Sequence, residues 1–135
     1  MRPNTLAEAI ERTRMGTSQD VALAEFVDTF DLAPTIEARY ATIVEEPALT
    51  NDKRLDALVG AIAEYLAKQR KLGRVPSWVG GSARYLDQPW HTCSPANDAM
   101  REYLTFSSPA EFASRNIFTE ERPLRRARGL QSTQT

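Results

Sequence analysis

Apolar residues at helical spacing between residues 52 and 73 are the feature that most constrains how this chain can fold. One continuous helix face would consist of Leu55, Leu58, Val59, Ile62 and Leu66. Either Asn51 or Asp52 can cap the first turn, and Gly73 follows basic residues that suit a helix C-terminus. We therefore predict a long central helix over about residues 52–72, against which the rest of the chain packs.

Three shorter helices are expected before it. Asn4 or Thr5 can cap a first helix that extends to about residue 15, with Gly16 as its left-handed stop. A second helix should run from its cap at Ser18 to about residue 32. A third should have Pro34 at its first position, where the missing N–H costs nothing, and should end before residue 47.

The helical periodicity is lost after Gly73. Residues 73–93 are rich in Trp and Pro, so we expect an irregular segment that tertiary contacts hold in place. A further helix should open at Ser94. Its buried face would consist of Met100, Tyr103 and Leu104. A last short helix should begin with a capping box formed by Ser108 and Glu111, and Asn116 can end it in a left-handed conformation.

These patterns predict an all-α fold, because no alternating run bounded by hairpin turns occurs. We expect a compact bundle of about six or seven short helices around the long one. A chain of 135 residues suits a single domain, which we place at residues 1–128. The polar end, residues 129–135, should form a mobile, disordered tail.

The charge of the chain is small in total but uneven along its length. The formal net charge is -1, yet residues 1–52 hold ten acidic residues against four arginines, and residues 53–135 hold thirteen basic residues against eight acidic ones. Such asymmetry permits contact with a charged partner or with a second copy, although two solvated faces of one globule would give the same pattern. The oligomeric state is left open.

Cysteine content and hydropathy indicate a compartment. The single cysteine, Cys93, cannot form an internal disulfide and suits a reducing environment. No run of about 20 apolar residues is present to span a membrane, and the N-terminal residues do not have the pattern of a signal peptide. We therefore expect a cytoplasmic protein with no membrane partner.

Few residues have the chemistry of a catalytic or metal site. His91 and Cys93 are the only soft metal donors, so we expect neither a metal nor a cofactor. The same two residues could form a thiol–imidazole pair, but no third orienting group is evident, and a stand-alone enzyme is the least favoured alternative. No nucleotide-binding glycine motif occurs.

Nucleic-acid binding is the main alternative function. The Arg-rich C-terminal region, which includes Arg122 and Arg125, could neutralise phosphates in a transcriptional regulator. The first two predicted helices, however, are acidic and would repel DNA. Nucleic acid is therefore a possible but not a favoured partner.

Aromatic and arginine side chains of the second half have the composition of protein-binding hot spots. The predicted partner-binding residues are Trp78, Arg84, Tyr85, Trp90, Arg115, Asn116, Phe118, Arg122 and Arg125. We expect most of them to form one exposed face, although Trp78 and Trp90 could instead cover a small helical core.

Four motifs carry a family resemblance: Val75-Pro76-x-Trp78-Val79, Arg84-Tyr85-Leu86-Asp87-x-Pro89-Trp90, Ser108-Pro109-Ala110-x-Phe112 and Arg115-Asn116-Ile117-Phe118. In their order and spacing the chain resembles a family of small bacterial proteins, frequent in actinobacteria, that are encoded beside minimal nucleotidyltransferase-like proteins. The resemblance implies a non-enzymatic, protein-binding antitoxin. Its partner would be the nucleotidyltransferase-like toxin encoded nearby, of a kind that modifies tRNA acceptor ends.

Overall fold

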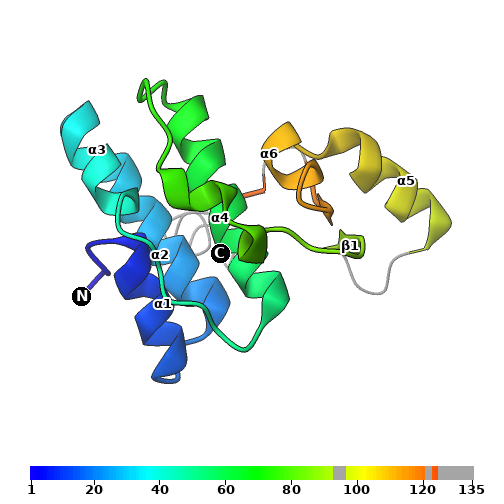
Figure 1. Cartoon of the computed structure of the whole chain (residues 1–135), viewed down its shortest axis with the longest axis horizontal. Helices are drawn as coiled ribbons and strands as arrows, with labels where there is room; N and C mark the ends of the chain where they lie inside the picture. The colour runs from blue at the N-terminus through cyan, green and yellow to red at the C-terminus, as the bar shows by residue number, and fades with distance from the viewer. Residues whose placement is uncertain (93–96, 121–122, 125–135) are drawn as a thin grey trace, which may run out of the picture.

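The computed structural model is mostly helical, as the sequence predicts (Figure 1). It describes residues 1–92, 97–120 and 123–124, so the expected tail at 129–135 lies outside the described residues. The α-helices are α1 (Leu6–Arg14), α2 (Gln19–Leu32), α3 (Ile36–Ile43), α4 (Lys53–Gln69), α5 (Asp98–Ser107) and α6 (Ala110–Ala113). Two single-turn 3-10 helices follow α4, η1 (Ser77–Gly80) and η2 (Ser82–Arg84). Within these ranges, no helix combines the length and apolar character that a membrane crossing requires.

Three helix starts confirm the caps read from the sequence. The side chains of Thr5, Ser18 and Asp52 accept hydrogen bonds from backbone N–H groups in the first turns of α1, α2 and α4. Helix α3 begins differently from the prediction. The Thr35 side chain is its cap and accepts from the Ala38 amide at 3.0 Å, so Pro34 lies before the helix and not at its first position.

The end of α4 also differs from the prediction. The helix stops at Gln69, and Lys71 takes a left-handed conformation with φ of 54°. The Leu72 amide then donates to the Ala67 carbonyl at 3.0 Å, which is the bonding pattern of a Schellman motif. A lysine in place of the expected Gly73 thus forms the left-handed stop, and α4 is shorter than the predicted 52–72.

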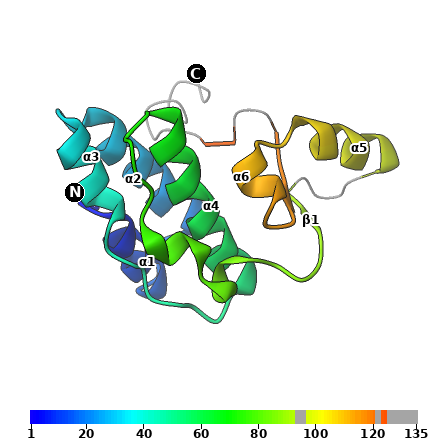
Figure 2. The same ribbon diagram turned by 45° about the horizontal axis from the view of Figure 1, so that its top comes forward.

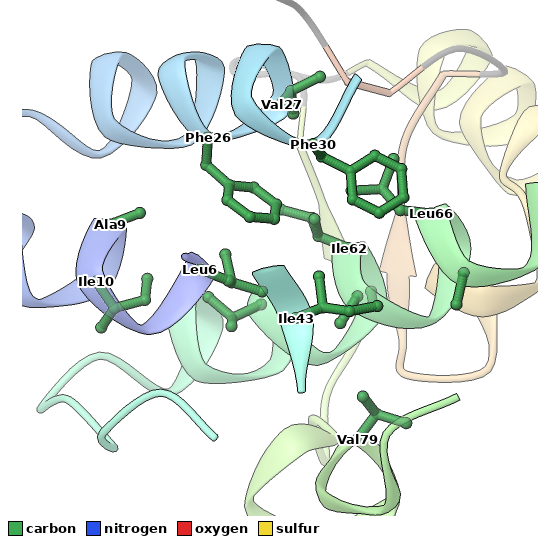
Figure 3. Packing of buried hydrophobic residues seen from close by; sticks show 14 of the residues in the cluster. Leu6, Ala9, Ile10, Phe26, Val27, Phe30, Ile43, Ile62, Leu66 and Val79 are labelled. Atoms are coloured by element: carbon green, nitrogen blue, oxygen red, sulfur yellow. The ribbon is translucent and has the colours of Figure 1, made fainter. Parts of the chain in front are cut away.

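The hydrophobic core lies between α1, α2 and the apolar face of α4 (Figure 3). Its buried members include Leu6 and Ile10 from α1 and Ile62 from α4. The rings of Phe26 and Phe30 on α2 lie 6.4 Å apart, with both side chains at 0% exposed. Of the face predicted for α4, Leu55, Val59, Ile62 and Leu66 are confirmed as buried core residues, and Leu58 is partly buried at its edge.

A short parallel strand pair was not predicted. β1 (Trp90–His91) pairs with β2 (Ile117–Phe118), and the Trp90 amide donates to the Asn116 carbonyl at 2.8 Å. Strands of two residues are too short for alternation to be visible in the sequence. The pairing joins the irregular segment to the chain that follows α6.

Helix α5 stands apart from α1, α2 and α3, on the other side of α4 (Figure 1 and Figure 2). It begins at Asp98, where the Asn97 side chain accepts from the Met100 amide at 2.8 Å; the expected start at Ser94 lies outside the described residues. Its predicted buried face is wrong in part. Leu104 is buried, but Met100 is 38% exposed and Tyr103 is 55% exposed.

The predicted capping box of α6 is not formed. Pro109 is the residue before α6, and no side chain caps the helix. The Ser108 hydroxyl instead accepts from the Thr119 amide at 2.8 Å. This serine therefore fixes the segment after β2 against the end of α5.

Candidate functional site

Two arginines predicted for an exposed face are buried. Arg84 and Arg115 are each 1% exposed, so the expectation of an accessible guanidinium surface at these positions is wrong. Both side chains pass α4 at Gly60. A Cβ atom at Gly60 would lie 2.9 Å from the Arg84 Cβ and 3.4 Å from the Arg115 Nε. The missing side chain of Gly60 thus makes the room that both arginines occupy.

Arg84 ties the segment before α4 to the helix. Its guanidinium donates to the carbonyl of Asp56 at 3.2 Å, to the carbonyl of Pro47 at 2.7 Å and to the Glu46 carboxylate at 3.1 Å. The same group lies 4.9 Å from the centre of the Trp78 ring. These contacts explain the burial, because a buried charge needs paired and hydrogen-bonded surroundings.

Arg115 joins α6 and η1 to α4. One terminal nitrogen donates to the Glu64 carboxylate of α4 at 2.6 Å and to the Glu111 carbonyl of α6 at 2.7 Å. The other donates to the Val79 carbonyl of η1 at 2.9 Å. The Tyr85 ring covers the guanidinium at 4.6 Å. Arg115 is therefore an internal tie and not a surface contact.

The Glu64 carboxylate balances this buried charge and also pairs with Lys68, whose ammonium lies 3.0 Å away. Burial acts to raise the pKa of Glu64, but the hydrogen bonds from Arg115 and Lys68 outweigh it and hold that pKa below its ordinary value. The hydrogen bond to Glu64 in turn raises the pKa of Lys68. The ion pair of Glu64 with Arg115 is thus favoured in its charged form.

Trp78 and Asn116 also hold the backbone in place. The half-buried Trp78 donates its indole N–H to the Ile43 carbonyl at 3.0 Å, at the end of α3. Asn116 has φ of 65°, as the sequence predicts, and its side-chain amide donates to the Leu86 carbonyl at 2.7 Å. Both residues have structural contacts that the expectation of one exposed face did not include.

The other predicted partner-binding residues differ in their exposure. Tyr85 is 41% exposed, and Phe118 is half-buried with its ring stacked on His91 at 5.1 Å. Arg122 and Arg125 lie outside the described residues, as does Cys93, so the least favoured alternative, a thiol–imidazole pair with His91, has no described geometry. A role for these side chains in partner binding stays a prediction. Among the residues that the structure does describe, no group of three His, Cys, Asp or Glu is placed to hold a metal.

Trp90 lines an open groove of about 630 Å³, which lies between the α2–α4 side of the molecule and α5. Its apolar lining consists of Leu23, Ala24 and Val27 of α2, Leu58 and Ile62 of α4, Trp90 of β1, Met100, Tyr103 and Leu104 of α5, Phe112 of α6, and Pro123 and Leu124. We call this feature the α2–α5 groove. Its size suits a few large side chains of a ligand.

The charged side chains in the lining of the α2–α5 groove are acidic, and the Arg54 guanidinium lies 5.2 Å from the centre of the lining Trp90 ring. Among its described lining residues the only charged side chains are those of Asp20, at the start of α2, and Glu120, after β2. The other polar residues of the lining are Gln19, Thr92 and Thr119. The groove therefore combines an apolar floor with acidic groups.

The sequence did not predict the groove, although it did indicate part of its apolar lining. Met100, Tyr103 and Leu104 form the apolar face read from the sequence of α5, and all three line the groove. Only Leu104 is covered by the rest of the chain. Phe106, on the same helix, is 82% exposed. Helix α5 thus presents more apolar surface than this chain buries.

Comparison with protein-family models, with curated proteins and with solved structures gave no match for this chain.

Proposed function

We propose that this protein acts without chemistry of its own, by binding another protein. Its partner is a nucleotidyltransferase-like toxin encoded nearby, which it neutralises as an antitoxin. The α2–α5 groove is the observation that supports protein binding. The choice of partner rests on the sequence motifs that resemble antitoxins encoded beside such toxins.

Exposed apolar side chains supply the driving force for binding. Burial of apolar surface contributes about 25 cal/mol per Å². Tyr103 at 55% exposed and Phe106 at 82% exposed leave large rings in water that a partner would cover. Aromatic residues of this kind carry much of the energy of protein interfaces.

We further propose that the fold is a compact bundle with α4 as its central helix. Arg84 and Arg115 support this arrangement, because each connects α4 to segments distant in sequence. These ties hold η1, α6 and the segment before α4 against α4, the helix that contributes Leu58 and Ile62 to the groove.

Co-expression with the product of the adjacent gene tests the proposal. We expect the full chain to restore growth to cells that express the toxin and to co-purify with it. A double substitution of two groove-lining residues, Met100→Ser with Tyr103→Ser, should reduce both effects. The matched control is Leu32→Ser with Ile36→Ser, which removes two exposed apolar side chains that do not line the groove. Unchanged toxicity and no co-purification would refute the proposed function.

A negative result could also reveal the alternative. If the chain instead binds its own promoter DNA with an affinity that falls steeply as salt rises, phosphate contacts dominate and the regulator is the better description. Absence of such a slope would remove that alternative.

A further inference from the structure

Resting on the proposed function, we infer that the α2–α5 groove binds an amphipathic helix of the partner. That helix would carry a stripe of large apolar side chains with Lys or Arg at its edges. The inference goes beyond the proposed function because it names the site and the chemistry of the segment that fills it.

The walls of the groove explain the apolar stripe. On one side Leu23 and Val27 lie one turn apart on α2, and on the other Met100 and Tyr103 lie on α5. Trp90 and other apolar residues complete the floor between them. Side chains three or four residues apart on a ligand helix lie on one face and would reach both walls.

The scarcity of polar groups favours a helix over an extended peptide. An extended segment in this groove would bring backbone N–H and C=O groups against an apolar lining, and unpaired buried groups are costly. A helix bonds these groups internally. It can therefore lie in the groove with only side chains in contact.

Asp20 and Glu120 explain the basic edges. They are the only charged residues among the described lining, and both are exposed. A partner helix with Lys or Arg at matching positions gains attraction, while an acidic one is repelled. Charge complementarity thus selects a basic segment.

The test uses the full chain and two synthetic helical peptides of about 18 residues, which span ~27 Å. Both carry the same leucine stripe, one flanked by Lys and the other by Glu. We expect fluorescence anisotropy to show that the Lys peptide binds at least about tenfold more tightly, with an affinity that weakens as salt is added. Equal binding of the two peptides would overturn the inference.

A site-specific readout locates the peptide. The chain has two tryptophans, so 5-fluorotryptophan labelling gives two ¹⁹F resonances, and a Trp78→Phe variant assigns them. The Lys peptide should shift the Trp90 resonance, because Trp90 lines the groove, and leave the Trp78 resonance unchanged. A shift of Trp78 alone would place the peptide elsewhere and overturn the inference.

Charge reversal supplies the matched variants. Asp20→Lys should weaken Lys-peptide binding by about three- to tenfold. Glu37→Lys is its control: both are acidic, exposed second residues of a helix, so loss of the favourable N-terminal charge is common to both. Equal effects of the two substitutions would contradict a role for the groove.

Two further experiments would reveal a different occupant of the groove. A dimer in sedimentation that Asp20→Lys dissociates would assign the groove to a second copy. A rise of tenfold or more in Lys-peptide affinity on changing Arg125, Arg126 and Arg128 to Glu would assign it to this chain's own C-terminal segment. Either result overturns a partner helix as the occupant.

Failure of this inference is separate from failure of the proposed function. If the toxin co-purifies equally with the wild-type chain and with Asp20→Lys carrying Tyr103→Ser, the antitoxin function stands and the groove is not its site. If no toxin is bound while the Lys peptide still occupies the groove, the function is refuted and the groove chemistry is retained.

Discussion

Replacement of Arg115 by Met should destabilise the fold more than any surface change. The arginine is 1% exposed and donates three hydrogen bonds, to the Glu64 carboxylate and to the carbonyls of Glu111 and Val79. Methionine has a similar length but no donor. The substitution leaves two carbonyls and a carboxylate without this partner.

The size of the effect follows from these contacts. Removal of one partner of a buried ion pair costs about 3–5 kcal/mol. The Glu64 side chain is 20% exposed and keeps its contact with Lys68, so the lower end applies, about 3 kcal/mol. Arg115→Lys retains a charge but loses the planar fork, and should cost about 1–2 kcal/mol.

Urea unfolding followed by circular dichroism measures the change. Arg101→Met is the matched control, because Arg101 is exposed and, within the described part of the chain, forms an ion pair only with Asp98 on its own helix. It should change the free energy of unfolding by less than about 0.5 kcal/mol. If Arg115→Met and Arg101→Met are equally stable, Arg115 is not an internal tie and the reasoning fails.

Three further predictions concern α4 and α5. Gly60→Ala should lower the free energy of unfolding by about 1–2 kcal/mol, because the new Cβ would lie 2.9 Å from the Arg84 Cβ and this clash outweighs the better helix propensity of alanine. The control in the same urea assay is Gly80→Ala, which should be tolerated because the space around Gly80 is open. The pKa of Glu64 is lowered in the folded chain, so the stability that its charged form contributes is present above the unfolded pKa of ~4.3 and is lost as pH falls through the folded pKa. The Glu64→Gln variant should therefore lose less unfolding free energy than the wild-type chain between pH 6 and 3, and an equal loss would contradict this. Phe106→Ser should change the unfolding free energy by under about 0.5 kcal/mol, since the ring is 82% exposed, and a larger loss would mean that it packs.

Local features of this fold were predictable from sequence. The caps at Thr5, Ser18 and Asp52 depend on residues within one turn, so a short stretch of sequence determines them. The left-handed Asn116 belongs to the same class. The strand pair at Trp90 was missed because its partner lies 27 positions away and each strand has two residues.

The burial of Arg84 and Arg115 could not be read from composition. Arginine and aromatic residues together are also the composition of exposed hot spots, and the carbonyls that accept hydrogen bonds from these two arginines belong to distant segments. One signal was available. Gly60 lies in the middle of a strong helix, where glycine costs about 1 kcal/mol relative to alanine, and this indicates a close approach.

The α2–α5 groove could not be predicted from the sequence either, because it depends on how distant segments pack. Helical spacing of Met100, Tyr103 and Leu104 predicts that a face is apolar, but not which element covers it. In the structure the chain covers only Leu104. Met100 and Tyr103 stay exposed, and the tertiary structure places them in the lining of a groove that α2 also lines.

Hydrogen–deuterium exchange on the complex with the neighbouring nucleotidyltransferase-like protein tests the central claim most directly. Binding in the α2–α5 groove predicts slower exchange in α2 around Leu23 and in α5 around Tyr103, with little change in α3, which does not line the groove. Protection confined to α3 or to the segment around Tyr85, with α5 unchanged, would contradict it.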